Sequence, residues 1–182
     1  MPHASLHVRP ATTADIPAIA AIYGDAVRTG TASFELEPPD AAEMLRRYEA
    51  LMHAGYPYLV AVDGDAGGTV LGYAYAGAFR PRTAYRFTVE NSVYVAPLAH
   101  KRGVGRALMT ALIDECTARG FRQMIAVIGD SANAGSIALH RGCGFHDVGN
   151  LRCTGLKFGG WLDTVLMQRA LGEGEDTIPT AS

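Results

Sequence analysis

Glycines and basic residues meet between a predicted strand and a predicted helix in the segment ENSVYVAPLAHKRGVGRAL, residues 90–108. The strand-like run Ser92–Val95 ends before Pro97, and apolar residues recur at helical spacing from Val104 onward. Glycines in such a turn let backbone N–H groups approach an anion, and the helix N-terminus adds partial positive charge. Three basic side chains flank the turn: Lys101, Arg102 and Arg106. The pattern predicts a pyrophosphate site.

Two common phosphate motifs do not fit this turn. A P-loop requires lysine after its glycines, whereas Lys101 precedes Gly103 and Gly105. A dinucleotide fingerprint requires a third small residue where Leu108 stands. Taken alone, Gly-x-Gly is equally consistent with a basic helix cap.

A second segment, NAGSIALHRGCGF at residues 133–145, supports the anion-site interpretation. It predicts a short helix that ends near Gly144, with Phe145 beginning the next strand. The two segments together resemble the GCN5-related N-acetyltransferases, whose acetyl-CoA loop reads [QR]xxGxG/A. His100 takes the place of the usual Gln or Arg, and His140 that of the usual Tyr. Asn133, Ser136, Leu139 and the pair Gly144-Phe145 keep the family's spacing.

The resemblance extends to a subgroup, the phosphinothricin and methionine sulfoximine N-acetyltransferases. It covers roughly residues 6–171 and is carried by TVENSVYV, AVIGDSANAGS, GLKFGGWLDTVLMQ, ASFELEPP and FRPRTAYRFTVE. It implies an α/β (α+β) fold, with a mixed central sheet and helices on both faces. It also implies acetyl-CoA as cosubstrate, a small amino-acid-like acceptor and a homodimer.

Glu90 is the candidate general base. An ammonium must lose its proton before it can attack a thioester, and a carboxylate among Phe87, Val89 and Val93 is expected to have a raised pKa. The pattern alone also allows an exposed strand carboxylate. The resemblance assigns this glutamate as base.

His140 is the second candidate catalytic residue, and acid, base and orienting roles remain open for it. By resemblance, a backbone N–H of Tyr94 or Val95 stabilises the oxyanion where two strands separate. The full acetyl-CoA site that the resemblance implies is Val93, Tyr94, Val95, His100, Lys101, Arg102, Gly103, Val104, Gly105, Arg106, Asn133 and Ser136.

Arg80 and Arg82 flank Pro81 shortly before Glu90 and are candidates to hold a substrate carboxylate. Two arginines this close repel each other, and an anion between them relieves that repulsion. Solvated loop arginines are the alternative. The resemblance adds further substrate-binding candidates: Phe34, Glu35, Tyr85, Lys157 and Trp161.

Two other functions are weighed against this one. Acetylation of an aminoglycoside would call for a pocket rich in acidic residues, whereas this chain supplies Arg80, Arg82 and Lys157; acetylation of a peptide N-terminus stays open. A non-catalytic acyl-CoA-binding module would keep the glycine turn and lose the acid/base pair, so Glu90 and His140 argue against it.

Composition bounds the remaining possibilities. The chain has 182 residues, 48% of them hydrophobic, which suffices for one domain with a buried core. A net charge of −2 gives no general attraction to nucleic acid or membrane, and no apolar run approaches ~20 residues. The N-terminus lacks a signal-peptide core, so we expect a cytoplasmic protein with reduced cysteines. His140, Cys143 and His146 lack metal-site spacing, and no metal is expected.

Periodicity and turn residues predict the elements. Strands are expected at 6–9, 58–62, 70–79, 85–95, 123–128, 144–151 and 158–168. Helices are expected after Thr12 or Thr13, and at 40–52, 104–119 and 134–141, with Asp40 capping the second and Met44, Leu45, Tyr48, Leu51 and Met52 facing inward. A hairpin turn is expected at 63–68, one domain over 1–171, and a disordered tail over 172–182.

Overall fold

A computed structural model describes residues 6–64 and 67–179 of the chain. Its strands form one seven-stranded sheet in the order β1-β2-β3-β4-β5-β7-β6. The strands are β1 (Leu6–Pro10), β2 (Tyr58–Asp63), β3 (Val70–Ala78), β4 (Thr88–Val95), β5 (Gln123–Gly129), β6 (His146–Lys157) and β7 (Gly160–Ala170). The helices are α1 (Ile16–Thr29), α2 (Ala41–His53), α3 (Val104–Ala118) and α4 (Ala134–Gly142), with short 3₁₀ turns at Thr13–Asp15, Thr83–Tyr85 and Pro97–Ala99.

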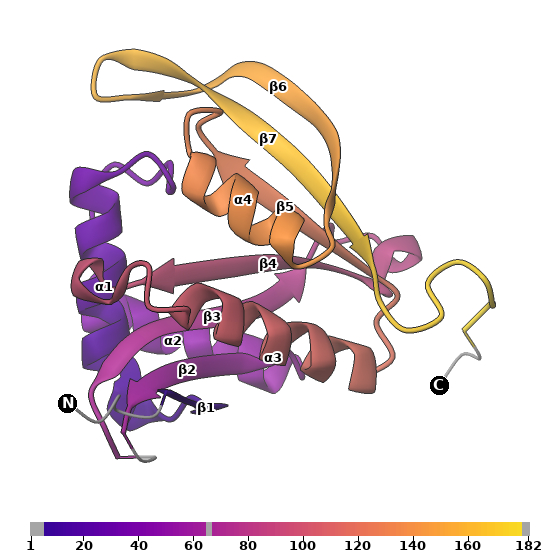
Figure 1. Ribbon diagram of the computed structural model, residues 1–182, viewed down its shortest axis with the longest axis horizontal. Coiled ribbons are helices and arrows are strands. Elements are labelled where there is room, and N and C mark those ends of the chain that lie inside the picture. Colours follow the sequence, from indigo (N-terminus) through magenta and orange to yellow (C-terminus); the bar gives the residue numbers. More distant parts are fainter. Residues whose placement is uncertain (1–5, 65–66, 180–182) are drawn as a thin grey trace.

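The helices cover both faces of the sheet, as Figure 1 shows: α1 and α2 lie on one face, and α3 and α4 on the other. Side-chain alternation along β2 explains why two cores form. Tyr58, Val60 and Val62 pack with α1 and α2, whereas Leu59 and Ala61 pack on the α3 side. The predicted α/β fold, a mixed sheet with helices on both faces, is confirmed.

Strands β4 and β5 form a parallel pair, whereas the other neighbouring strands pair antiparallel. Their register covers only Thr88–Asn91 opposite Gln123–Ala126. Beyond it β4 continues beside β3 to Val95, and β5 continues beside β7 to Gly129. The sheet therefore splits after Asn91, and this split creates the site described below.

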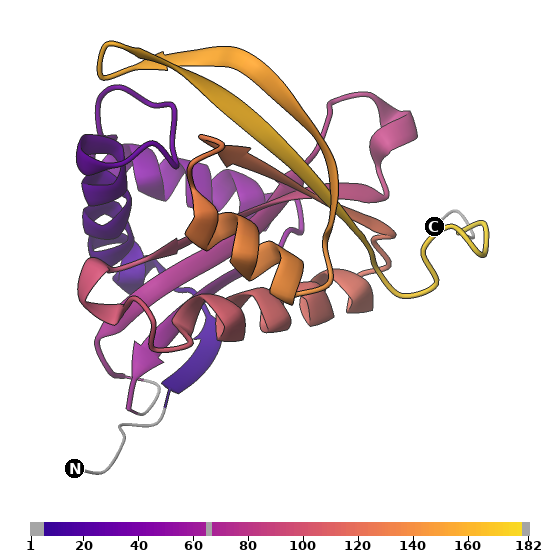
Figure 2. The ribbon, with the colours of Figure 1, turned by 45° about the horizontal axis from the view of Figure 1, so that its top comes forward.

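The long hairpin of β6 and β7 crosses above the split and ends near the loop that follows α1, as both ribbon views show (Figure 2). Hydrogen bonds from Lys157 to the carbonyl oxygens of Gly30 and Ser33 confirm that these distant segments touch. The two halves of the split sheet are therefore joined at this end by the loop after α1.

The helix predictions are close to the structure. Asp40 caps α2, because its carboxylate accepts a hydrogen bond from the Glu43 N–H at 2.8 Å. The first helix begins later than expected, because a 3₁₀ turn at Thr13–Asp15 precedes it. One expected inward residue is wrong: Met52 is 42% exposed near the end of α2.

Three strands differ from the prediction by two residues or more at an end. β4 begins at Thr88 and not at residue 85, because Thr83–Tyr85 closes into a 3₁₀ turn. β6 and β7 both begin later than expected, and β6 is also longer. Register shifts between Leu151 and Gly155 carry β6 on to Lys157, and the left-handed Phe158 and Gly159 then make the hairpin turn.

Two predicted segments lie partly outside the described residues. The turn at 63–68 includes residues 65 and 66, although Asp63 N–H donates to the Thr69 carbonyl at 2.9 Å beside it. The disordered tail stays a prediction: residues 172–179 form turns in which Glu173 pairs with Arg122 at 3.2 Å. Among the residues described, no helix combines the length and apolar character needed to cross a membrane.

Candidate active site

A cleft opens where β4 and β5 separate. Its walls come from the loop after α1, from both strands and from α4: Ala32, Asn91, Ser92, Val93, Tyr94, Ala126, Val127, Ile128, Gly129, Asn133, Ser136 and His140. The sequence predicted Val93, Tyr94, Asn133, Ser136 and His140 for this site. Binding sites for small molecules are concave and carry a few converging polar groups, so this cleft is the candidate active site.

The glycine turn lies at the start of α3, next to this cleft. Gly103 has φ of 82°, a left-handed conformation suited to glycine, and Lys101 is also left-handed at φ 61°. The first bond of α3 runs from Ala107 N–H to the Gly103 carbonyl at 3.0 Å. The N–H groups of Val104, Gly105 and Arg106 precede that bond and point out of the helix end. The turn thus presents the donors that a pyrophosphate requires.

The basic side chains around the turn differ in the partners that they contact. Arg102 pairs with Asp63 at 3.2 Å, and the guanidinium of Arg106 reaches the last turn of α4 beside Gly142. Lys101 is exposed. The imidazole Nε2 of His100 lies 3.0 Å from the Val95 carbonyl, to which it donates. The backbone donors and the exposed Lys101 are therefore the candidate anion contacts of this turn.

Backbone alternation decides which N–H of β4 faces the cleft. The Ala96 N–H donates to the Leu71 carbonyl beside β3 at 2.8 Å, and the Thr88 carbonyl also faces β3. Because successive peptide groups of a strand point to opposite sides, the N–H of Tyr94 faces β3 and that of Val95 faces the split. Of the two predicted oxyanion donors, Val95 has the required direction.

Glu90 lies at the inner end of the split, on the α1 and α2 face of the sheet. Its antiparallel partner is Gly77, and the strand neighbours Tyr75 and Tyr94 belong to the same core. Burial raises the pKa of Glu90, and the positive charge of Arg80 partly opposes this. A carboxylate with a raised pKa near a cation is suited to take a proton near neutral pH.

His140 lies on the opposite face and contacts Asn91, not Glu90. Its Nε2 is 2.9 Å from Asn91 Oδ1, and its Nδ1 is 2.8 Å from the Ser136 carbonyl. The side chain is 2% exposed, and burial lowers its pKa, while the Ser136 carbonyl partly opposes that shift. The edge of the Phe145 ring, 5.1 Å away, completes its surroundings. Both ring nitrogens are already engaged within the protein.

The predicted arginines lie in the exposed loop before β4. Arg80 stacks over the ring of Phe79, whose other neighbour is Tyr85 in an edge contact at 5.8 Å. Arg82 is exposed where the 3₁₀ turn begins. Only Arg80 acts on the pKa of Glu90. The assignment of Arg80 and Arg82 to substrate binding stays a prediction, and Arg80 is the one whose charge acts on Glu90.

The other predicted substrate residues lie at the hairpin and the loop after α1. Trp161 is 66% exposed on β7. Phe34 packs against the backbone at Gly129 and Gly155, where a Cβ would meet its ring at 2.9 Å and 2.4 Å. Lys157 is buried and donates to two backbone carbonyls of the loop.

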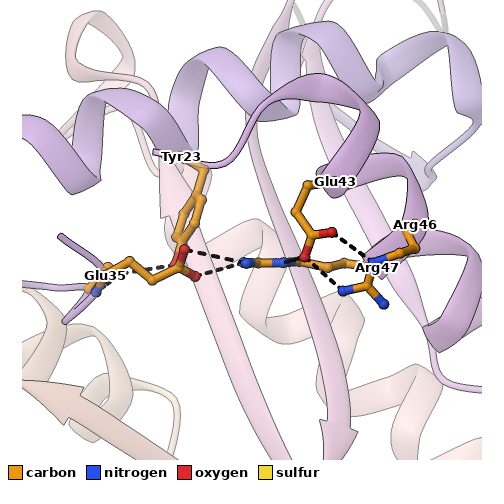
Figure 3. A network of polar contacts seen from close by, with 6 residues as sticks. Tyr23, Glu35, Glu43, Arg46 and Arg47 are labelled. Carbon is orange, nitrogen blue, oxygen red and sulfur yellow. Dashed lines mark hydrogen bonds and ion pairs between the residues drawn. The ribbon is translucent and has the colours of Figure 1, made fainter. Parts of the chain in front are cut away.

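Glu35 belongs to a network that Figure 3 shows. Its carboxylate accepts from Arg47 at 2.6 Å and from the Tyr23 hydroxyl at 2.8 Å, while Arg47 Nε also binds Glu43 at 2.7 Å. Burial raises the pKa of Glu35, but the hydrogen bonds from Arg47 and Tyr23 outweigh it, so the net pKa is lowered. Glu35 is therefore an anion committed to Arg47.

Comparison with known proteins decides the family. A model of the acetyltransferase (GNAT) family matches residues 19–145, more than half of the chain. The chain belongs to the GNAT acetyltransferase family. The predicted family is thus confirmed, and the enzyme is an N-acetyltransferase.

Relatives in this family resemble the chain over most of its length. A phosphinothricin N-acetyltransferase of Alcaligenes faecalis is 55% identical over 165 residues, covering 91% of this chain and 82% of that protein. An L-methionine sulfoximine/L-methionine sulfone acetyltransferase of Pseudomonas paraeruginosa is 46% identical over 164 residues, covering 90% and 94%. A phosphinothricin acetyltransferase of Sinorhizobium meliloti, solved in complex with AcCoA, is 52% identical with a TM-score of 0.91, covering 96% and 93%.

Sequence reasoning did not single out Asn91 or Ala32. Both line the cleft, and Asn91 contacts His140 across 49 residues of sequence. Its place directly after Glu90 on the strand was the available signal. Over residues 6–64 and 67–179, no group of three or more His, Cys, Asp or Glu side chains is arranged to hold a metal ion.

Proposed function

We propose that this enzyme transfers the acetyl group of acetyl-CoA directly to the α-amine of a small amino-acid-like compound, with Glu90 as general base. Substrates of the phosphinothricin, methionine sulfoximine and methionine sulfone type fit the names of its relatives. The observation that supports this proposal best is the cleft at the split between β4 and β5. Strand β4 runs along it from Asn91, the residue after Glu90, through Val93 and Tyr94, and it leads toward the glycine turn before α3.

The glycine turn fits the pyrophosphate of acetyl-CoA. A Cβ added at Gly103 would meet nothing within 4 Å, so the space beside this left-handed residue is open. The N–H groups of Val104, Gly105 and Arg106 follow this residue at the start of α3, and the exposed Lys101 precedes it. Asn133 and Ser136, at the start of α4, supply polar atoms along the cleft wall. Acetyl-CoA, when bound, supplies an activated acyl group with a thiolate leaving group.

The chain's residues would act in sequence. Glu90 takes a proton from the substrate ammonium, which frees the nitrogen lone pair for attack on the acyl carbon. The Val95 N–H donates to the carbonyl oxygen as negative charge develops there. The new C–N bond forms as the C–S bond breaks, the electron pair leaves with sulfur, and the remaining nitrogen proton passes to solvent or to the thiolate.

A substrate carboxylate matches the cations near the acceptor end. Burial raises the pKa of Glu90, and the charge of Arg80 opposes part of that rise; Arg82 follows two residues later. A guanidinium holds carboxylate, phosphinate or sulfone oxygens through paired N–H donors. An amino acid therefore suits this opening better than a polycationic aminoglycoside.

The test is a thiol-release assay with acetyl-CoA and a panel of amino acids with their sulfone, sulfoximine and phosphinate analogues. Activity on at least one of them, lost in Glu90→Gln, is expected. Each good substrate is also assayed as its carboxamide, which should be discriminated against through a much lower kcat/KM. Equal rates on acid and amide would favour a peptide N-terminus instead, and acetyl-CoA binding without turnover would favour a non-catalytic module.

We also infer a cytoplasmic homodimer. β6 forms one edge of the sheet and presents exposed apolar side chains, among them Val148, Leu151 and Leu156. Unpaired edges of this kind commonly associate with a second copy. Cys116, Cys143 and Cys153 are free thiols, in keeping with a reducing compartment. Light scattering coupled to size exclusion tests the dimer, and Leu151→Glu should weaken it.

A further inference from the structure

Lys157 is a buried cation whose bonds go to the protein itself. It lies at the end of β6, next to the hairpin turn, and is 4% exposed. Its ammonium donates to the Ser33 carbonyl at 2.7 Å and to the Gly30 carbonyl at 2.9 Å, more than 120 residues away in sequence. A buried ammonium is costly unless such acceptors satisfy it. These two carbonyl contacts therefore fix the position of the Lys157 ammonium.

The same loop is held to the β5 side by two further contacts. The Thr31 hydroxyl donates to the Asp130 carboxylate at 2.7 Å, directly after β5. The Phe34 ring lies where Cβ atoms at Gly129 and Gly155 would be, so only glycine admits it at these two positions. The loop over residues 30–35 thus rests on the end of β5 and on the hairpin.

Helices α1 and α2 hold the loop from the other side. The Tyr23 hydroxyl lies 2.9 Å from Ser33 Oγ and 2.8 Å from Glu35, and Arg47 binds Glu35 (Figure 3). Burial raises the pKa of Tyr23 to about 12, so its hydroxyl keeps its proton and donates it to Glu35. The loop is fastened from both halves of the split sheet, and its Ala32 forms part of the cleft wall.

We propose that Lys157 is a positioning residue: it fixes the loop over residues 30–35 as the acceptor-side wall of the cleft, and it sets acceptor affinity without touching the acceptor. The proposal rests on the acetyltransferase function proposed above. The position of the ammonium supports it, because two donors already bind loop carbonyls and the side chain is almost fully enclosed. One of the three ammonium N–H donors remains beyond these two bonds, but a side chain that is 4% exposed leaves little room for a substrate carboxylate to reach it.

Substitution of Lys157 by methionine separates the two roles. Met has similar length and no donor, so the Gly30 and Ser33 carbonyls lose their partner. We expect the KM for the amino-acid substrate to rise on the order of tenfold, as small misplacements of a positioning wall are costly. The KM for acetyl-CoA should not change. Arg152→Met removes an exposed cation from the same strand and serves as the matched control.

The acid and carboxamide forms of one substrate distinguish a wall from a ligand. If Lys157 positions the loop, Lys157→Met weakens both forms and leaves their ratio of kcat/KM as in the wild type. If Lys157 holds the substrate carboxylate, the variant loses the preference for the acid. Collapse of that ratio, or a KM for acetyl-CoA that rises as much as the KM for the amino-acid substrate, would overturn the proposal.

Amide hydrogen exchange tests the loop without any substrate. In Lys157→Met the amides of Gly30 and Glu35, which donate to the Ala26 carbonyl and to Ser33 Oγ, should exchange faster, while those of α3 exchange as in the wild type. Unchanged exchange in the loop would contradict the proposal even in an active enzyme. If the wild type acetylated no amino acid, the proposed function would fail while this measurement still decided the role of Lys157. Lys157→Gln, which keeps a donor amide, carries both tests if the methionine variant does not fold.

Discussion

The imidazole of His140 and the amide of Asn91 meet at the point where β4 and β5 part, with Nε2 2.9 Å from Oδ1. The orientation of the amide follows from its other end, which donates from Nδ2 to the Ile125 carbonyl at 3.1 Å. Because Nδ1 faces the Ser136 carbonyl, both ring nitrogens face acceptors. This arrangement favours a proton on each nitrogen, whereas burial favours the neutral ring.

The first prediction is that Asn91 tunes the pKa of His140. Asn91→Asp places an anion beside Nε2 and should raise that pKa, whereas Asn91→Leu removes the acceptor and should lower it further. Nitrogen NMR titration of the ring measures both shifts, and the signal that disappears in His140→Gln identifies the residue. A His140 pKa that is the same in all three proteins would refute the coupling.

Other charged groups near His140 do not interfere with the measurement of its pKa. Cys143 follows it on the same helix end, with Arg106 and Arg169 acting on that thiol, and Glu90 lies on the other face of β4. Burial and the Ser136 carbonyl are the causes of the His140 shift. A lowered folded pKa means that the His140 contribution to stability is complete above about pH 6.5 and declines as pH falls below it.

The second prediction concerns Glu90 and Arg80 together. Glu90→Gln should lower kcat by at least about 10²-fold, because the amide cannot accept the ammonium proton. Arg80→Ala removes the positive charge that opposes burial, so it should raise the pKa of Glu90 and move the acidic limb of the kcat profile to higher pH. Arg86→Ala, a nearby exposed arginine stacked on Phe87, is the control and should leave that limb in place.

Glu90→Gln should also stabilise the folded protein at neutral pH. The folded pKa of Glu90 is raised, so its favourable contribution is complete below about pH 4.5 and is lost as pH rises through the folded pKa. Chemical denaturation at several pH values checks the sign. If Glu90→Gln had the same free energy of unfolding as the wild type at neutral pH, the Glu90 carboxylate would be satisfied as an anion in the folded state.

Local signals explain what the sequence could predict. The glycine turn at Gly103 and the cap at Asp40 each depend on residues within about one helical turn, so spacing alone located them. Strand β4 was predicted three residues too early, because nothing in the apolar pattern distinguishes Tyr85, Arg86 and Phe87 from strand. Register shifts in β6 hid its length for a similar reason.

Long-range contacts explain what it could not predict. The partner of His140 lies 49 residues away, and that of Lys157 more than 120 residues away. Neither pairing follows from periodicity, since each depends on where the sheet splits and where the hairpin ends. The sequence therefore supplied His140 and Lys157 as candidates, but it could not show that their polar atoms are already bound within the protein.

The third prediction concerns Arg47, which joins α2 to the loop after α1 (Figure 3). Arg47→Met should lower stability at neutral pH by about 0.5 kcal/mol, a value reduced for solvent screening because both side chains are over one-third exposed. Glu35 has a lowered pKa in the fold, so this loss should fade as pH falls through that pKa. Arg46→Met is the control, because Arg46 contacts Glu43 and is 70% exposed. An equal effect of the two variants would contradict a special role for Arg47.

The fourth prediction compares two glycines of equal geometry at opposite ends of α3. Gly103 and Gly120 both have φ of 82°, and a Cβ at either would meet nothing within 4 Å. Alanine at each position should therefore cost about 1 kcal/mol of stability through backbone strain. Only Gly103→Ala should weaken acetyl-CoA binding, by at least about tenfold, because its methyl group occupies the space in which backbone N–H groups would meet the pyrophosphate. Calorimetric titration with acetyl-CoA separates the variants.

Gly105 is less suitable for this test, since a Cβ there would lie 3.1 Å from Leu139 and would disturb α4 as well. If Gly103→Ala and Gly120→Ala bound acetyl-CoA equally well, the turn would be a helix cap and not the pyrophosphate site.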